Sequence, residues 1–259
     1  AFDRSRGEGR AALVVYLTAF DPDGDRSLET MVAAAEAGAD VLEVGVPFSD
    51  PTADGPTIQA AMDRALRAGA SLVGTLELVE RLRRRSEIPV VLFTYANPLL
   101  RLGDEAPARL RAAGVDGVLV LDVPAPQGGF LREPLRAAGL DWIGLVGPRT
   151  SADRAAAIAE ASSGFVYQVA RTGVTGEGGG LDATVRDRVA RLRGVTDLPV
   201  AVGFGVRTPE DAARVAALAD GVVVGSHLVR LGHAGWSAGS DGASAVARAI
   251  GDLRPALRR

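Results

Sequence analysis

Short apolar runs alternate with longer amphipathic segments along the whole chain. Eight runs lie at 12–19, 41–48, 89–96, 117–124, 142–148, 164–170, 199–206 and 221–228. Their nearly continuous hydrophobicity is typical of strands that are buried on both faces of a parallel sheet. Ala-, Leu-, Arg- and Glu-rich stretches of helical length separate them, for example 26–37, 75–85, 105–113, 152–162 and 208–219. The pattern therefore predicts repeated strand–helix units.

The joints between these units also repeat. Gly38, Gly114 and Gly139 each end a helical stretch just before a strand, where a helix C-cap favours a positive φ. Thr208 is a plausible helix N-cap. Eight such units favour an α/β protein with a closed (β/α)8 TIM barrel, in a single domain over residues 1–259. The alternative is an open doubly wound sheet, but the segment TAFDPDG after the first strand is not a nucleotide-binding loop.

Composition narrows the possible partners and compartments. The formal net charge is −3, with acidic and basic residues interspersed, and no apolar run approaches the length of a membrane span. The first ten residues, AFDRSRGEGR, lack the apolar core of a signal peptide. We therefore expect a cytoplasmic protein that binds neither nucleic acid nor membrane.

Missing residue types narrow the chemistry. The chain contains no Cys, and every one of its 29 basic residues is Arg rather than Lys. A thiol nucleophile and a Schiff-base lysine are therefore excluded. The two histidines are His227, placed in the eighth run, and His233, placed in a Gly/Ser-rich stretch at 232–243 that we expect to be a loop. They make a zinc site improbable, so no metal is expected. Carboxylates are the leading candidates for proton transfer.

Glu43 is the most unusual carboxylate, because it interrupts an apolar strand. Leu42, Val44 and Val46 form a uniformly apolar face that should pack against helices, which directs Glu43 into the barrel interior. A partly desolvated carboxyl group there would have a raised pKa, suited to acid–base catalysis. The alternative is a structural Glu paired with an Arg.

A second acidic group follows in the loop SDPTADGP, which carries Asp50 and Asp54 at the mouth of the expected barrel. Functional groups of barrel enzymes lie at this end of the strands. Asp-Pro and Asp-Gly are also common turn dipeptides, so the loop by itself leaves the role of both residues open.

Glycines follow the later strands, and aromatic residues lie near the same end. The glycines and their neighbouring serine, which suit a phosphate site after strands six to eight, are Gly173, Gly176, Gly203, Gly205, Gly225 and Ser226. The aromatic residues, which could line a pocket for a flat apolar ring, are Tyr16, Phe93, Tyr167 and Phe204. Ordinary turns and ordinary core packing are the respective alternatives.

Together these segments resemble the tryptophan synthase alpha subunit family. The most specific match is LEVGVPFSDPTADGPTIQA at 42–60, and the segments at 16–23, 121–126, 165–176, 199–206 and 222–226 agree in order and spacing. The resemblance covers nearly the whole chain. It implies a TIM-barrel lyase that cleaves indole-3-glycerol phosphate to indole and glyceraldehyde 3-phosphate in tryptophan biosynthesis.

The resemblance also implies roles for individual residues. Glu43 would be the catalytic acid–base, and Asp54 would be the catalytic residue that accepts from the indole N–H. Among the substrate-binding residues, Tyr16, Phe93 and Phe204 would surround the indole, and Tyr167 would lie beside Glu43. The phosphate would be bound by Gly176, Gly205, Gly225 and Ser226, and Thr175 would also contact the substrate. Arg171 would share a mobile loop with Thr175, while Asp50 and Pro51 would face a beta subunit.

Three interpretations of function remain open at this point. The first is the alpha subunit of an α2β2 tryptophan synthase, which needs no cofactor itself because pyridoxal phosphate resides in the beta subunit. The second is a stand-alone lyase that releases free indole. The third is a catalytically silent barrel that only binds a partner, although both catalytic carboxylates are present. Three residues depart from the family pattern: Phe20 replaces Gly, while Leu121 and His227 replace smaller residues.

Overall fold

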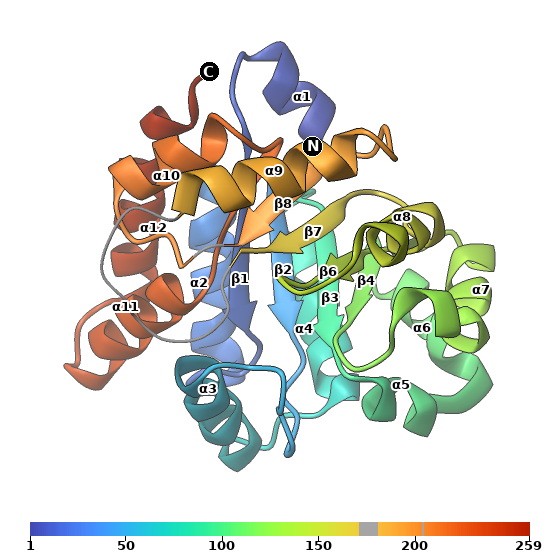
Figure 1. Ribbon diagram of the computed structural model, residues 1–259. Coiled ribbons are helices and arrows are strands. Elements are labelled where there is room, and N and C mark those ends of the chain that lie inside the picture. The colour runs from blue at the N-terminus through green and yellow to red at the C-terminus, as the bar shows by residue number, and fades with distance from the viewer. Residues whose placement is uncertain (171–180, 204) are drawn as a thin grey trace.

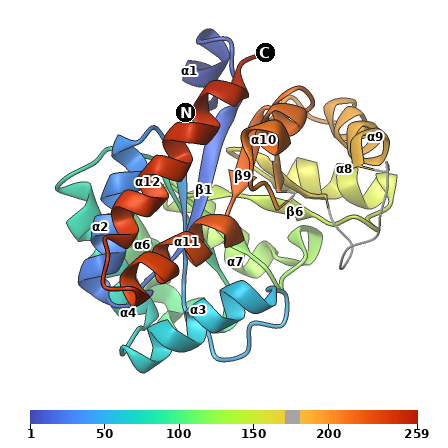
Figure 2. The same cartoon turned by 90° about the vertical axis from the view of Figure 1, so that its left-hand side faces the viewer.

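The computed structural model describes residues 1–170, 181–203 and 205–259. A parallel sheet runs through its centre, and helices surround the sheet (Figure 1, and Figure 2 after a quarter turn). The strands are β1 (Ala12–Thr18), β2 (Val41–Gly45), β3 (Val90–Thr94), β4 (Gly117–Val120), β5 (Asp141–Trp142), β6 (Gly144–Val146), β7 (Val166–Val169), β8 (Val200–Gly203) and β9 (Gly221–Val224).

The strand order is β5-β4-β3-β2-β1-β9-β8-β7-β6, so the two ends of the sheet are consecutive in sequence. The expected fifth strand at 142–148 is therefore divided. Its first part, β5, pairs with β4, and its second part, β6, pairs with β7. The two parts meet at Ile143, whose N–H still donates to Val118 O at 2.9 Å. The division marks the point where one strand changes partners, and the predicted (β/α)8 barrel is confirmed.

Twelve α-helices are present in the described residues. They are α1 (Phe2–Gly7), α2 (Gly24–Glu36), α3 (Pro56–Arg67), α4 (Leu72–Arg83), α5 (Ala96–Leu102), α6 (Ala106–Ala112), α7 (Gly129–Ala137), α8 (Ala152–Ala161), α9 (Leu181–Arg193), α10 (Pro209–Ala216), α11 (Ser226–Ser237) and α12 (Gly242–Leu253). None of these described helices is long and apolar enough to cross a membrane.

Helix ends follow the expected local rules. Gly38, Gly114 and Gly139 have φ values of 104°, 91° and 78°, as predicted for helix C-caps. Thr208 caps α10, and its side chain and that of Asp211 form a complete capping box. These local signals explain why the helix boundaries could be located from sequence.

The placement of both histidines was wrong. The eighth apolar run ends as a strand at Val224, and Gly225 is the N-cap of α11, so His227 lies in a helix rather than in a strand. His233 also lies in α11, which continues to Ser237, so the expected loop at 232–243 shrinks to 238–241. Leu228, Val229 and Gly232 are buried and lie on one face of this helix. The helical spacing of these residues was overlooked because the segment is rich in Gly and Ser.

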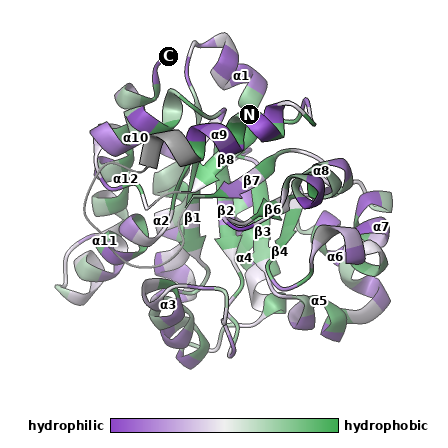
Figure 3. Cartoon of the chain, viewed as in Figure 1, coloured by the Kyte–Doolittle hydropathy of each residue, from purple (hydrophilic) through white to green (hydrophobic). Residues whose placement is uncertain are grey.

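Two hydrophobic cores divide the side chains of each strand. Leu42, Val44 and Val46 belong to the core between sheet and helices, as the alternation predicted. Val41 instead belongs to a second core inside the barrel. Figure 3 shows the strands as mostly hydrophobic and the outer helices as carrying most hydrophilic residues. Glu43 therefore stands out as a carboxylate on the inward-facing side.

Aspartates just before the strands tie the N-terminal end of the barrel together. Asp40 accepts from the backbone N–H of Leu13 at 2.8 Å and from both terminal nitrogens of Arg10, at 2.5 and 2.9 Å. Asp116 and Asp220 repeat the arrangement, accepting from Val90 N–H and Val200 N–H respectively. Burial alone would raise the pKa of Asp40, but its hydrogen bonds, led by Arg10, hold that pKa below its usual range.

Candidate active site

Glu43 lies in the middle of β2 with its carboxyl group buried inside the barrel. Only 1% of the residue is exposed, and neither carboxyl oxygen has a hydrogen-bond partner in the described part of the chain. The alternative of a structural Glu paired with an Arg therefore finds no support there. Burial raises the pKa of Glu43 to about 8. The group is thus mostly protonated at neutral pH and able to donate a proton.

Asp54 lies in the loop between β2 and α3, directly before the N-cap residue Gly55. Its carboxyl oxygen Oδ2 accepts a hydrogen bond from the hydroxyl of Tyr95 at 2.7 Å. Burial raises the pKa of Asp54, while the Tyr95 hydrogen bond opposes that shift. Asp54 is half-buried, and a carboxylate at this position can accept a hydrogen bond from a ligand.

Tyr95 was missed from the sequence because it lies within the apolar run at 89–96 and was taken as part of the strand, which ends at Thr94. It is 1% exposed, accepts from Ala53 N–H at 3.1 Å, and stacks on Phe48 with ring centroids 4.9 Å apart. The same phenol therefore holds both the backbone before Asp54 and the Asp54 carboxylate. A usable signal was present, since the chain has only three tyrosines and the other two were already candidates.

The other two tyrosines, Tyr16 and Tyr167, also lie near the carboxylates. Tyr16 is the direct register partner of Glu43 on the neighbouring strand. Burial, together with the charges of Glu43 and Asp54, raises the pKa of both phenols, so both stay protonated. Phe93 meets Tyr16 edge to face at 5.1 Å. The structure therefore gathers three of the four predicted aromatic residues around Glu43.

Strand glycines make room for these two phenols. The Tyr16 hydroxyl lies over Gly45, and the Tyr167 hydroxyl lies over Gly203. A Cβ atom at either glycine would overlap with the phenol oxygen. Small residues at these positions thus allow aromatic side chains to reach the centre of the barrel.

The predicted phosphate residues fall at the same end of the barrel. Gly205 follows β8 with φ of 74°, while Gly225 follows β9 and begins α11 without a side-chain cap. Ser226 is the first residue of that helix. The backbone N–H groups of its first turn are therefore free of side-chain caps and available to an anion.

The remaining predicted residues divide into two groups. Arg171, Gly173, Thr175, Gly176 and Phe204 lie outside the described residues. Asp50 is exposed and accepts from the Ser49 hydroxyl at 2.5 Å, whereas Pro51 is half-buried and its carbonyl accepts from Gln59 at 3.3 Å. The outer side of the SDPTADGP loop is therefore accessible.

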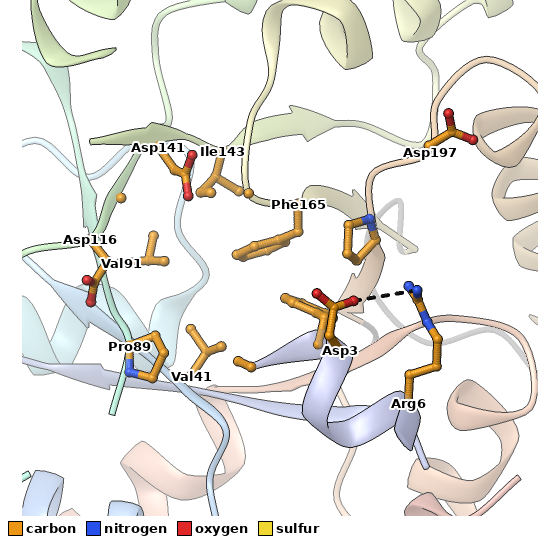
Figure 4. Close-up of a pocket in the computed structure, with 15 residues that line it drawn as sticks. Asp3, Arg6, Val41, Pro89, Val91, Asp116, Asp141, Ile143, Phe165 and Asp197 are labelled. Atoms are coloured by element: carbon orange, nitrogen blue, oxygen red, sulfur yellow. Dashed lines mark ion pairs between the residues drawn. The ribbon is translucent and has the colours of Figure 1, made fainter. Parts of the chain in front are cut away.

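A separate cavity of about 520 Å³ lies at the opposite end of the barrel (Figure 4). Its lining includes Val41, Pro89 and Pro199, which stand at or just before the starts of strands, and Phe2 of α1. Because catalytic groups of barrel enzymes lie at the C-terminal ends of the strands, this cavity is not the candidate active site. Among the residues described, no group of three or more His, Asp or Glu side chains is gathered to hold a metal ion.

Comparisons with known proteins agree with this geometry. The family model for the tryptophan synthase alpha chain matches residues 2–251. The tryptophan synthase alpha chain of Dechloromonas aromatica is 49% identical over 231 residues, covering 88% of this chain and 86% of the relative. That of Acidiphilium cryptum is 46% identical over 258 residues, covering 99% and 94%.

Solved structures show the same relationship. The alpha subunit of tryptophan synthase from Legionella pneumophila str. Paris superimposes with a TM-score of 0.91 at 33% identity, over 99% of this chain and 96% of that one. A Mycobacterium tuberculosis tryptophan synthase structure gives 0.90 at 39% identity, over 100% and 96%. With family model, sequence relatives and barrel in agreement, the chain belongs to the tryptophan synthase alpha chain family.

Proposed function

We propose that this chain cleaves indole-3-glycerol phosphate into indole and glyceraldehyde 3-phosphate, with Glu43 as the acid–base group and Asp54 as the partner of the indole N–H. Membership of the tryptophan synthase alpha chain family makes the chain a lyase of tryptophan biosynthesis. The residue assignments rest on the site. Their main support is the buried Glu43 carboxyl group, which has no protein partner in the described residues.

The cleavage can be followed as a balanced sequence of proton transfers. Protonated Glu43 donates its proton to C3 of the indole, and Asp54 accepts from the ring N–H as positive charge develops there. The bond from C3 to the glycerol carbon then breaks, and its electrons return to the ring. The hydroxyl on that carbon becomes the aldehyde and gives its proton to the Glu43 carboxylate. Glu43 thereby ends the cycle protonated, as it began.

The rest of the site supports a substrate with an aromatic ring at one end and a phosphate at the other. Tyr16 and Phe93 supply apolar ring surface next to Glu43. Gly205, Gly225 and Ser226 supply small residues and a helix N-terminus for the phosphate. In this assignment the carboxyl groups of Glu43 and Asp54 face the ring, and the backbone N–H groups of the α11 first turn face the phosphate.

We further propose that the chain works with a beta subunit in an α2β2 assembly, through the accessible loop that carries Asp50 and Pro51. The proposed chemistry requires no cofactor in this chain, and pyridoxal phosphate would belong to the partner. None of the relatives described above favours the stand-alone lyase. If the assignment is right, adding a beta subunit will greatly raise the weak cleavage activity of the purified chain. High unaided turnover would instead support the stand-alone lyase.

The decisive test of the catalytic assignment is Glu43→Gln, measured by indole release from indole-3-glycerol phosphate. The amide preserves size but cannot take up and return a proton, so activity should fall at least about 100-fold while the fold is retained. Glu36→Gln is the matched control, because Glu36 is an exposed residue of α2 and should retain full activity. Full activity in Glu43→Gln would overturn the assignment.

A further inference from the structure

His227 lies on one arm of the proposed phosphate site, close enough to the other arm for the charges of Arg207 and Asp211 to act on it. It is the second residue of α11, directly after Ser226, and it is half-buried. One arm is the uncapped first turn of α11 itself. The other arm is the loop after β8, which runs from Gly205 through Arg207 to the cap of α10.

Mostly positive groups surround the imidazole. Arg230 lies one turn further along α11, and its Nη1 donates to the Thr57 hydroxyl of α3 at 3.4 Å. Arg207 lies on the β8 loop. Asp211 of α10 is the acid that acts on the ring, but its carboxylate already accepts from the N–H groups of Arg207 and Thr208 and from Arg214. These three charged groups are the ones that act on His227 in the described part of the chain.

The surroundings favour an uncharged imidazole in the free protein. Burial, followed by the charges of Arg230 and Arg207, lowers the pKa of His227, and Asp211 offsets this only in part. At neutral pH the site therefore has two fixed guanidinium charges and one imidazole that can be charged if an anion arrives. A doubly charged phosphate next to the ring would reverse the balance of charge around it.

We infer that His227 is a specificity-determining residue for the phosphate group, and that it takes up a proton as the phosphate dianion of the substrate binds. This inference rests on the proposed function, since it concerns the same phosphate site. The protonated imidazole would hold the phosphate by charge, in addition to the backbone N–H groups of the α11 first turn.

Proton uptake has a measurable consequence with a definite sign. The ring is neutral in the free protein and charged in the complex, so binding consumes a proton between the two pKa values of His227. Affinity for a phosphate monoester should therefore increase as pH falls through that interval. An opposite charge at close range shifts a pKa by at least about one unit, which corresponds to about tenfold in affinity.

The chain suits a direct test, because it has only two histidines. We would titrate both imidazoles by NMR, with and without saturating glycerol 3-phosphate. The expected result is that the pKa of His227 rises by about one unit with ligand. The signals of His233, further along α11, serve as the internal reference. In His227→Ala, the affinity for glycerol 3-phosphate should no longer show the pH dependence caused by proton uptake at His227. His233→Ala is the matched control and should retain that pH dependence.

Two different failures can be told apart in the same spectra. Ligand-induced shifts of the Gly225 and Ser226 amides with no change in the His227 titration would overturn the role of His227 and leave the proposed function standing. The absence of any response at Gly225 and Ser226 would overturn the phosphate site itself, and this inference with it.

Discussion

The Tyr95 hydroxyl donates a 2.7 Å hydrogen bond to Oδ2 of Asp54, linking the residue after β3 to the loop after β2. The hydroxyl oxygen of Tyr95 in turn accepts a hydrogen bond from Ala53 N–H at 3.1 Å. Asp54 would otherwise depend on a loop of Pro and Gly residues for its position. A buried aromatic side chain therefore fixes the orientation of the second proposed catalytic carboxylate.

Replacing Tyr95 with Phe should keep the ring stacked on Phe48 and remove the hydrogen bond to Asp54. The pKa of Asp54 should rise further, because the Tyr95 hydrogen bond now lowers it against the effect of burial. We expect kcat/KM to fall by about tenfold, as loss of a hydrogen bond to a charged group typically costs about 1.5 kcal/mol or more. The acidic limb of the pH–rate profile should move to higher pH, and an unmoved limb would contradict this role.

Glu43→Gln should make the protein more stable at alkaline pH while it loses activity. The folded-state pKa of about 8 exceeds the ordinary value of 4.5. The unfolded chain thus holds fewer protons between these values, and the stability of the wild type falls as pH rises from 4.5 to 8. Urea unfolding at pH 5 and pH 8 should show the variant gaining a few kcal/mol at the higher pH only. An equal difference at both pH values would argue against a buried, protonated Glu43.

Asp40→Asn should destabilise the fold, because it removes the buried carboxylate partner of Arg10 and leaves only the exposed Glu8 paired with that guanidinium. The side chains of Asp40 and Arg10 are only 1% and 5% exposed, and breaking such a pair costs about 3–5 kcal/mol. Since the folded-state pKa of Asp40 is lowered, its contribution is present above the ordinary pKa and is lost as pH falls below it. Asp25→Asn is the matched control, because its ion pair with Arg81 is exposed and should contribute less than about 1 kcal/mol.

Gly45→Ala should force the Tyr16 phenol out of its place beside Glu43. The added methyl would overlap with the phenol oxygen and ring, and overpacking of this kind costs about 1–3 kcal/mol. Thermal unfolding should show the loss, and Tyr16→Val in the same chain should restore much of it. Gly251→Ala provides the contrast, since its Cβ would meet nothing within 4 Å in helix α12. If Gly45→Ala were as stable as the wild type, the close approach of Tyr16 would be refuted.

Much of this architecture follows from short-range patterns in the sequence. Apolar runs separated by helical stretches, with Gly38 and Gly114 at helix ends, specify βα units whatever their surroundings. The alternation around Glu43 also predicts its direction, because a strand has only two faces. The absence of Lys and Cys then leaves carboxylates for the chemistry. These inferences depend on local backbone geometry and on residue type, both of which are present in the sequence.

Contacts between segments that are far apart in the chain could not be predicted from the sequence and became visible only in the folded structure. Tyr95 meets Asp54 from 41 residues away, and nothing local to Tyr95 distinguishes it from a core residue. His227 was expected to lie in a strand, because an apolar run in the sequence is compatible with either a strand or a helix. The sheet pairing of β9 ends at Val224, and Gly225 begins the helix that contains His227. That the Glu43 carboxyl group has no hydrogen-bond partner among the described residues also depends on which side chains the neighbouring strands place inside the barrel. The sequence determined which groups could react, and packing in three dimensions determined their protonation and their partners.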